Sequence, residues 1–246
     1  MGLQRTEWKD IARIAFLVIG QAGTGKTSLI RTICGQQFNF DTQNWENTTM
    51  PPESICVLSA ENGLLCVQDL VKHNVIESWN ITCLGDFQEA AAELANGTLK
   101  DRSGNKYKWI FIDSLTEIAK KCKEAIEDDC KKEDFRMWGL YYKEMEKLVK
   151  QFRDMKDYHI VFTCLENYDS ENKIITPMLD SPRLRQELPS YFDEVFRMEK
   201  KIIGDKVKVE FATSFPVGLA KDRSGLLNKY EEAHLLKIRK KVFGDI

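Results

Sequence analysis

Residues 20–27 read Gly-Gln-Ala-Gly-Thr-Gly-Lys-Thr, and the fold can be worked out from this stretch. An apolar run, residues 14–19, comes before it, and a helix-like run, residues 28–34, follows it. This order predicts a buried strand, a glycine-rich turn and the start of a helix. Glycines let such a turn curl so that backbone N–H groups and the amino end of the helix face phosphate oxygens. The spacing G-x-x-x-x-G-K-T is the P-loop pattern, which predicts a nucleotide-binding site.

Two side chains of this loop predict the cofactors. Lys26 is placed to neutralise the β- and γ-phosphates of a nucleotide, and the Thr27 hydroxyl is placed to ligate Mg²⁺. We therefore expect ATP and Mg²⁺ as cofactors. The residues expected to hold the nucleotide are Gly20, Gln21, Ala22, Gly23, Thr24, Gly25, Lys26, Thr27 and Ser28.

The size and composition of the chain fit an α/β protein with a sizeable core. It has 246 residues, of which 43% are hydrophobic. We expect a single domain over residues 1–246, although two small ones would fit this length. Residues 1–13 read as a short polar extension and residues 227–246 as a basic C-terminal helix. The net charge of −2 excludes a globally basic nucleic-acid binder but leaves room for a local basic groove.

Cysteine usage and hydropathy favour a cytoplasmic protein. Seven cysteines are scattered without a C-x-x-C pair, and the chain has only three histidines. This pattern argues against a zinc site and predicts reduced, mostly buried thiols. The N-terminus lacks the apolar segment of a signal peptide, and no apolar run approaches the ~18 residues of a membrane span.

Two later strands are expected to end in a carboxylate. Residues 55–60 form a continuous apolar run followed by Glu61, and residues 108–112 form another followed by Asp113. Because ligands bind at the carboxyl ends of parallel strands, both side chains should face the nucleotide. Asp113 has the Walker B position, where a carboxylate holds Mg²⁺, usually through a water molecule. Glu61 either faces the nucleotide in this way or simply caps the next helix.

A fourth strand is expected at residues 158–163. Its end lies beside the Asp113 strand, so a polar residue there could sense the γ-phosphate. Thr163 is the candidate for that contact, and Glu166 is the second choice for a catalytic carboxylate.

The rest of the chain is expected to alternate between covering helices and connections. The helices are expected at residues 64–72, within 86–97, at 115–156 with a loop within 120–132, and after Ser181 as far as Pro189. The other expected elements are an insertion or flap at 35–53, a strand at 80–84, a polar loop at 168–177, a hairpin of 194–199 with 206–211, and a basic loop at 221–225.

This order of motifs resembles the RecA-type ATPase core. More closely, it looks like the phage-encoded P-loop ATPases of the RecA superfamily, the single-strand annealing group. The resemblance implies an α/β fold with a mostly parallel central sheet flanked by helices and a C-terminal antiparallel hairpin extension. It spans residues 14 to about 226 and rests on Gly20–Thr27, Glu61–Gly63, Ile110–Glu117, Trp138-Gly139, Leu188–Asp193 and Lys221-Asp-Arg223.

The resemblance also implies roles for individual residues. Glu61 would polarise the attacking water, and Thr27 with Asp113 would position Mg²⁺. Lys221 and Arg223 would reach the γ-phosphate of a neighbouring subunit as fingers in trans, which would make assembly necessary for hydrolysis.

The implied function is DNA-stimulated ATP hydrolysis by a homo-oligomer, ring or filament, that binds single-stranded DNA. Annealing, or mediation beside a single-strand DNA-binding protein, fits better than strand exchange, because residues 1–13 leave no room for a separate oligomerisation domain. The location would be the cytoplasm of an infected host cell. Two other functions stay open: a nucleotide-gated assembly module, such as a helicase loader or packaging partner, and a P-loop kinase of a small molecule.

Overall fold

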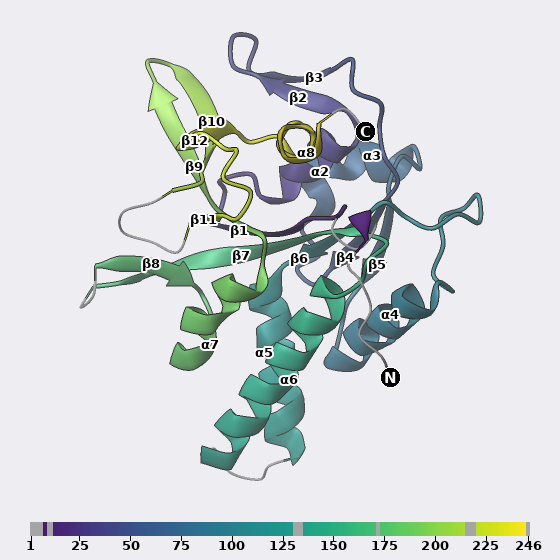
Figure 1. Cartoon of the computed structure of the whole chain (residues 1–246), viewed down its shortest axis with the longest axis vertical. Coiled ribbons are helices and arrows are strands. Elements are labelled where there is room, and N and C mark those ends of the chain that lie inside the picture. Colours follow the sequence, from purple (N-terminus) through teal and green to yellow (C-terminus); the bar gives the residue numbers. More distant parts are fainter. Residues whose placement is uncertain (1–6, 9–11, 130–134, 171–172, 215–219, 245–246) are drawn as a thin grey trace.

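The computed structural model in Figure 1 describes residues 7–8, 12–129, 135–170, 173–214 and 220–244. A central sheet runs through it in the order β12-β10-β9-β1-β7-β6-β4-β5, with β11 added to β9 and β8 to β7, and β2 pairs with β3 separately. The strands are β1 (Ala15–Gly20), β2 (Gln36–Asn39), β3 (Asn44–Asn47), β4 (Ile55–Ser59), β5 (Glu77–Asn80), β6 (Trp109–Asp113), β7 (His159–Asp169), β8 (Ile174–Pro177), β9 (Glu194–Ile203), β10 (Lys206–Ala212), β11 (Lys221–Asp222) and β12 (Tyr230–Glu232).

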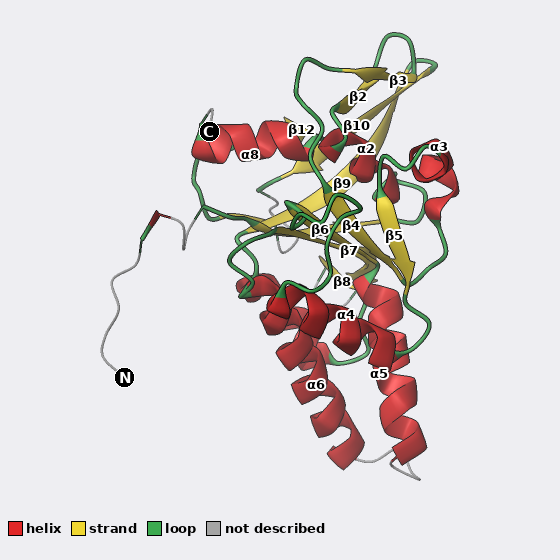
Figure 2. Cartoon of the chain, turned by 90° about the vertical axis from the view of Figure 1, so that its right-hand side faces the viewer, coloured by secondary structure: helices red, strands yellow, loops and turns green. Residues whose placement is uncertain are grey.

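Helices cover both faces of this sheet (Figure 2). The α-helices are α2 (Ile30–Ile33), α3 (Gln68–Lys72), α4 (Leu84–Asn96), α5 (Leu115–Asp129), α6 (Phe135–Arg153), α7 (Pro182–Glu187) and α8 (Leu235–Phe243). Three short 3-10 turns are η1 (Thr27–Leu29), η2 (Leu64–Val67) and η3 (Leu188–Tyr191). No helix in these described ranges combines the length and the apolar character needed to cross a membrane.

The strand order confirms the expected fold class. The strands from β9 through β1, β7, β6 and β4 to β5 are all parallel, whereas β10 and β12 are antiparallel additions at one edge. The P-loop strand β1 is separated from the Asp113 strand β6 by β7. This is an α/β fold of the RecA-like P-loop class, and the predicted hairpin is the β9–β10 pair.

Alternation along β1 divides the core into two layers. Ala15, Leu17 and Ile19 face a cluster that also includes side chains of α4, α5 and α6. Phe16 and Val18 face the opposite cluster, which α2, α3 and α8 complete. Because both faces of the strand are buried, its sequence reads as a continuous apolar run, as parallel strands do.

Four boundaries in the sequence-based prediction were wrong. The basic loop expected at 221–225 begins with strand β11, Lys221–Asp222, which pairs with β9. The strand expected at 80–84 lies at Glu77–Asn80, because the Asp86 carboxylate accepts hydrogen bonds from the backbone N–H groups of Thr82 and Cys83 and so caps α4. The polar loop expected at 168–177 includes the end of β7 and the antiparallel strand β8. The C-terminal helix begins at Leu235, since residues 230–232 pair with β10.

Residues 130–134 lie outside the described residues. The helix expected at 115–156 and the loop expected within 120–132 both include some of them. Helix α5 runs through the expected loop as far as Asp129. Cys130 also lies outside the described residues. The other six cysteines are free; Cys66 and Cys83 are exposed, and the remaining four are buried or half-buried.

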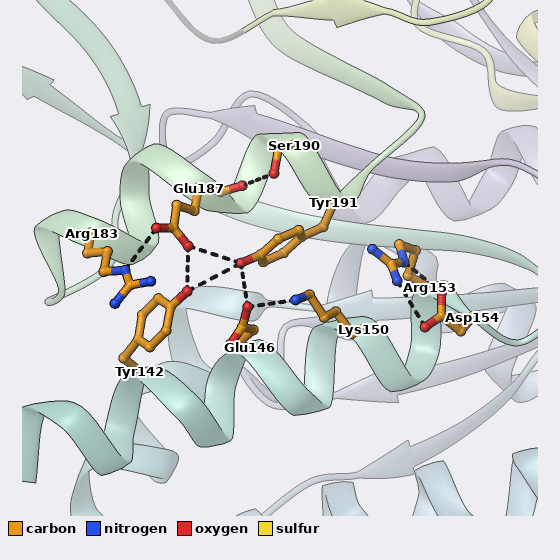
Figure 3. Close-up of polar contacts among 9 residues, drawn as sticks. All are labelled: Tyr142, Glu146, Lys150, Arg153, Asp154, Arg183, Glu187, Ser190 and Tyr191. Atoms are coloured by element: carbon orange, nitrogen blue, oxygen red, sulfur yellow. Dashed lines mark hydrogen bonds and ion pairs between the residues drawn. The ribbon is translucent and has the colours of Figure 1, made fainter.

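A polar network fixes α7 and η3 against α6 (Figure 3). The Tyr142 hydroxyl donates to the Glu187 carboxylate, and the Tyr191 hydroxyl donates to Glu146 Oε1 at 3.0 Å. Glu187 also accepts from Arg183 at 2.8 Å. The network therefore links α7 and η3 to α6.

Candidate nucleotide-binding site

The P-loop already has the curled shape that phosphate binding requires. Gly23 and Gly25 have φ angles of 77° and 98°, which side chains rarely allow. A Cβ on Gly20 would lie only 2.9 Å from the backbone oxygen of Met198, so this position needs glycine as well.

Lys26 lies inside the loop and is only 9% exposed. Its Nζ donates to the backbone oxygens of Gly20 at 2.9 Å and Gln21 at 2.8 Å. Burial lowers the pKa of Lys26, and the Asp113 and Glu61 carboxylates oppose that shift. A phosphate entering the loop would give this buried ammonium a charged partner.

Asp113 is almost fully buried, at 1% exposure, and accepts two hydroxyl hydrogen bonds. Thr27 Oγ1 donates to its Oδ2 at 2.6 Å, and Thr163 Oγ1 donates to its Oδ1 at 2.5 Å. The Thr27 hydroxyl, at the start of η1, and the Asp113 carboxylate, at the end of β6, both offer hard oxygen atoms as metal ligands. Such a donor pair fits Mg²⁺.

A cleft of about 640 Å³ opens in front of these groups. Lys26, Thr27, Glu61 and Asp113 all line it, so the structure brings these four predicted residues together. Thr163 is fully buried, and its hydroxyl lies behind the carboxylate of Asp113. The contact of Thr163 in this structure is therefore with Asp113.

Glu61 is exposed at the cleft and is held by a residue that the sequence analysis did not select. The Ser114 hydroxyl donates to Glu61 Oε1. Ser114 directly follows Asp113, and a polar residue just beyond a Walker B strand was the available signal. This contact joins the ends of β4 and β6. The Glu61 carboxylate is therefore oriented by a residue of a neighbouring strand end and not by its own loop.

The other predicted site residues lie elsewhere. Glu166 pairs with Arg197, whose Nε lies 2.9 Å from Glu166 Oε2. Lys221 is opposite Val195 in the sheet, and Val195 is opposite Leu17, three residues before Gly20. That offset is about 10 Å along the strand, away from the P-loop edge.

The side chains of Lys221 and Arg223 both donate hydrogen bonds within their own chain. The Lys221 Nζ donates to the backbone oxygen of Phe192 at 2.6 Å. Arg223 is 54% exposed and donates to Asp193 Oδ1 at 2.6 Å. Neither side chain contacts the P-loop of its own chain.

A family model described as an AAA domain matches residues 12–224. No curated protein sequence matches the chain. Among solved structures, a KaiC-like protein from the hyperthermophilic archaeon Pyrococcus horikoshii OT3 is similar, with a TM-score of 0.42 and 13% identity. That match covers 80% of this chain and 76% of the other.

Proposed function

Because the chain belongs to the AAA-domain family of P-loop ATPases, we propose that it hydrolyses ATP with Mg²⁺ in the cleft beside the P-loop. The observation that carries this proposal is the Thr27–Asp113 hydrogen bond of 2.6 Å, which puts two metal-binding groups beside the buried Lys26. Thr27 and Asp113 would hold Mg²⁺, which would supply positive charge to offset the negative charge that develops on the phosphate oxygens.

Residues of the chain would bind the phosphates, orient the attacking water and hold Asp113 in position. Lys26 would exchange its backbone partners for the β- and γ-phosphates, while the N–H groups of the P-loop hold the same oxygens. Glu61, oriented by Ser114, would orient the attacking water and accept its proton. Thr163 would hold Asp113 in place as a positioning residue.

The finer part of the proposal is an oligomer that anneals or mediates annealing of single-stranded DNA. It rests on the resemblance to phage-encoded ATPases of the RecA superfamily. Lys221 and Arg223 support the oligomer, because they lie away from their own P-loop edge, as groups that serve a neighbour's nucleotide would.

The decisive experiment for hydrolysis compares Glu61→Gln with Glu166→Gln. Glu61→Gln should remove ATP turnover and retain nucleotide binding, since only the water-activating carboxylate is lost. Retained turnover in Glu61→Gln, or loss only in Glu166→Gln, would reject Glu61 as the base.

A mixing experiment tests the action in trans. Arg223→Ala chains and Glu61→Gln chains should each be nearly inactive, and mixing them should restore turnover at interfaces that combine both intact groups. No recovery after subunit exchange would reject a shared site.

The role of DNA is tested by measuring turnover per subunit against protein concentration, with and without single-stranded DNA. The rate should increase with concentration and with DNA. A turnover rate that changes neither with protein concentration nor with DNA would favour a P-loop kinase of a small molecule or a nucleotide-gated assembly module.

A further inference from the structure

A second cavity, of about 620 Å³, lies on the other side of the P-loop. It shares Gly23, Gly25 and Ser28 with the cleft that contains Lys26 and Asp113. Its outer walls come from the β2–β3 hairpin and from β9, β10 and β12. These elements lie at the upper end of the molecule in Figure 1. A ligand held by the P-loop can therefore extend from one cavity into the other.

Aromatic rings line both walls of this second cavity. Phe38, Phe40 and Trp45 come from the hairpin, and Tyr230 comes from β12 on the opposite side. The Phe38 and Trp45 ring centroids are 5.6 Å apart at an angle of 65°. A volume in the range of about 300–1,000 Å³ with aromatic walls is typical of small-molecule sites. Flat heterocyclic rings stack on such side chains.

The charges of the lining argue against a second polyanion there. The lining includes three carboxylates of β10 and β12, Glu210, Glu231 and Glu232, and two lysines, Lys200 and Lys208. The carboxylates pair with Lys208 at 2.8 Å, Lys241 at 2.7 Å and Lys237 at 2.6 Å, respectively. Lysines that are paired in this way are not available to bind a polyphosphate, whereas an uncharged base and sugar need no such partner.

The β2–β3 hairpin, which forms one wall of the cavity, is held in place at both ends. Gln43, at its tip, accepts from the Val207 N–H at 2.9 Å and donates to the Val207 carbonyl oxygen at 3.2 Å. An ion pair of 3.0 Å between Lys206 and Asp41 lies beside this contact. At the base of the hairpin, the Thr48 N–H donates to the Gly35 carbonyl oxygen at 2.8 Å.

We infer that this cavity receives the base and ribose of the nucleotide whose phosphates the P-loop holds. The β2–β3 hairpin is then the element that recognises the nucleoside, with Trp45 and Tyr230 as its stacking residues. This inference rests on the proposed function, because it concerns the same bound nucleotide.

The test measures the Kd of ATP and of inorganic tripolyphosphate, which lacks the nucleoside, for the same variants. Trp45→Ala should raise the Kd of ATP by roughly 5- to 100-fold, the usual effect of losing one stacked ring. The Kd of tripolyphosphate should change less than about twofold by the same reasoning. Tyr230→Ala, on the other wall, should show the same selective loss.

Two controls separate stacking from folding. Thr49→Ala truncates an exposed side chain just beyond β3 that lies outside the lining, so it should leave both Kd values unchanged. Trp45→Phe should retain most of the affinity for ATP, because it keeps an aromatic ring.

The outcomes separate this inference from the proposed function. An equal loss of ATP and tripolyphosphate binding in Trp45→Ala, or no loss of either, overturns the inference and leaves the P-loop site intact. Normal ATP binding with lost binding of a single-stranded oligonucleotide overturns it in favour of a nucleic-acid site. A wild-type chain that binds neither ATP nor tripolyphosphate would instead refute the proposed function, and the inference with it.

Discussion

The Thr27 hydroxyl donates a 2.6 Å hydrogen bond to the Asp113 carboxylate, across 86 positions of sequence. The contact is possible because β1 and β6 run parallel with one strand between them, so that their carboxyl ends lie at the same edge. The two oxygen donors of the proposed metal site are therefore in place before any ligand binds.

Replacing Thr27 with valine should remove the effect of Mg²⁺ on nucleotide binding. The side chain keeps its shape but loses the hydroxyl, so ATP should bind equally well with Mg²⁺ and with EDTA, and turnover should fall roughly 100-fold. Thr27→Ser keeps the hydroxyl and is the matched control. Titrations at several Mg²⁺ concentrations check the result, and Mg²⁺-dependent affinity in Thr27→Val would show that the hydroxyl is not a ligand.

Ser114 should affect the rate of ATP hydrolysis only by orienting Glu61. Ser114→Ala removes the hydroxyl that holds the Glu61 carboxylate, so kcat should fall about tenfold while the Kd of ATP stays the same. The same substitution in a Glu61→Gln background should have no further effect, because the group that it positions is already gone. Additive losses in this double-mutant cycle would mean that Ser114 acts independently.

Glu194 should make the protein less stable as the pH rises. Burial raises the pKa of Glu194 to about 8, and the neighbouring Asp222 adds to the rise. Between the ordinary value of 4.5 and about 8, the folded chain keeps a proton that the unfolded chain loses. The free energy of unfolding should therefore decrease across this window, by at most about 1.4 kcal/mol per pH unit.

Denaturant unfolding of the wild type and of Glu194→Gln between pH 7 and 8, inside this window, isolates the contribution of Glu194. Burial lowers the pKa of His159 and His234 to about 4, so in this range both are neutral in the folded and the unfolded chain. Glu194→Gln carries no titrating group and should show a smaller decrease than the wild type. If the free energy of unfolding changes equally with pH in the wild type and in Glu194→Gln, the decrease does not come from Glu194.

Local patterns in the sequence were enough to predict the centre of the fold. The P-loop spacing and the uninterrupted apolar runs of β1, β4 and β6 depend on residues next to one another, and parallel pairing then brings Glu61, Asp113 and Thr27 to one edge. Those predictions needed no knowledge of distant contacts.

The missed features depend on contacts between distant segments. The hydroxyl of Thr163 turns to Asp113 because β6 and β7 are neighbours, and no local pattern shows which way a strand-end hydroxyl points. Residues 35–53 form a hairpin whose tip is held by Gln43 against β10, more than 160 positions away. A polar segment such as this looks like a loop until its partner strand is known.

The Tyr191 hydroxyl should stabilise η3, the segment whose Ser190 carbonyl oxygen accepts a hydrogen bond from Lys221. This hydroxyl donates to Glu146 at 3.0 Å, and the carbonyl oxygen of Ser190, the residue before Tyr191, accepts from Lys221 Nζ at 3.4 Å. Removing that hydroxyl in Tyr191→Phe leaves the Glu146 carboxylate with one donor fewer and should lower the Tm by about 2–4 °C. Tyr168→Phe, at a side chain that is 61% exposed, is the control and should melt like the wild type. If Tyr191→Phe also melts at the wild-type temperature, the network of Figure 3 does not stabilise η3, and the position of Lys221 must depend on its own contacts with the backbone.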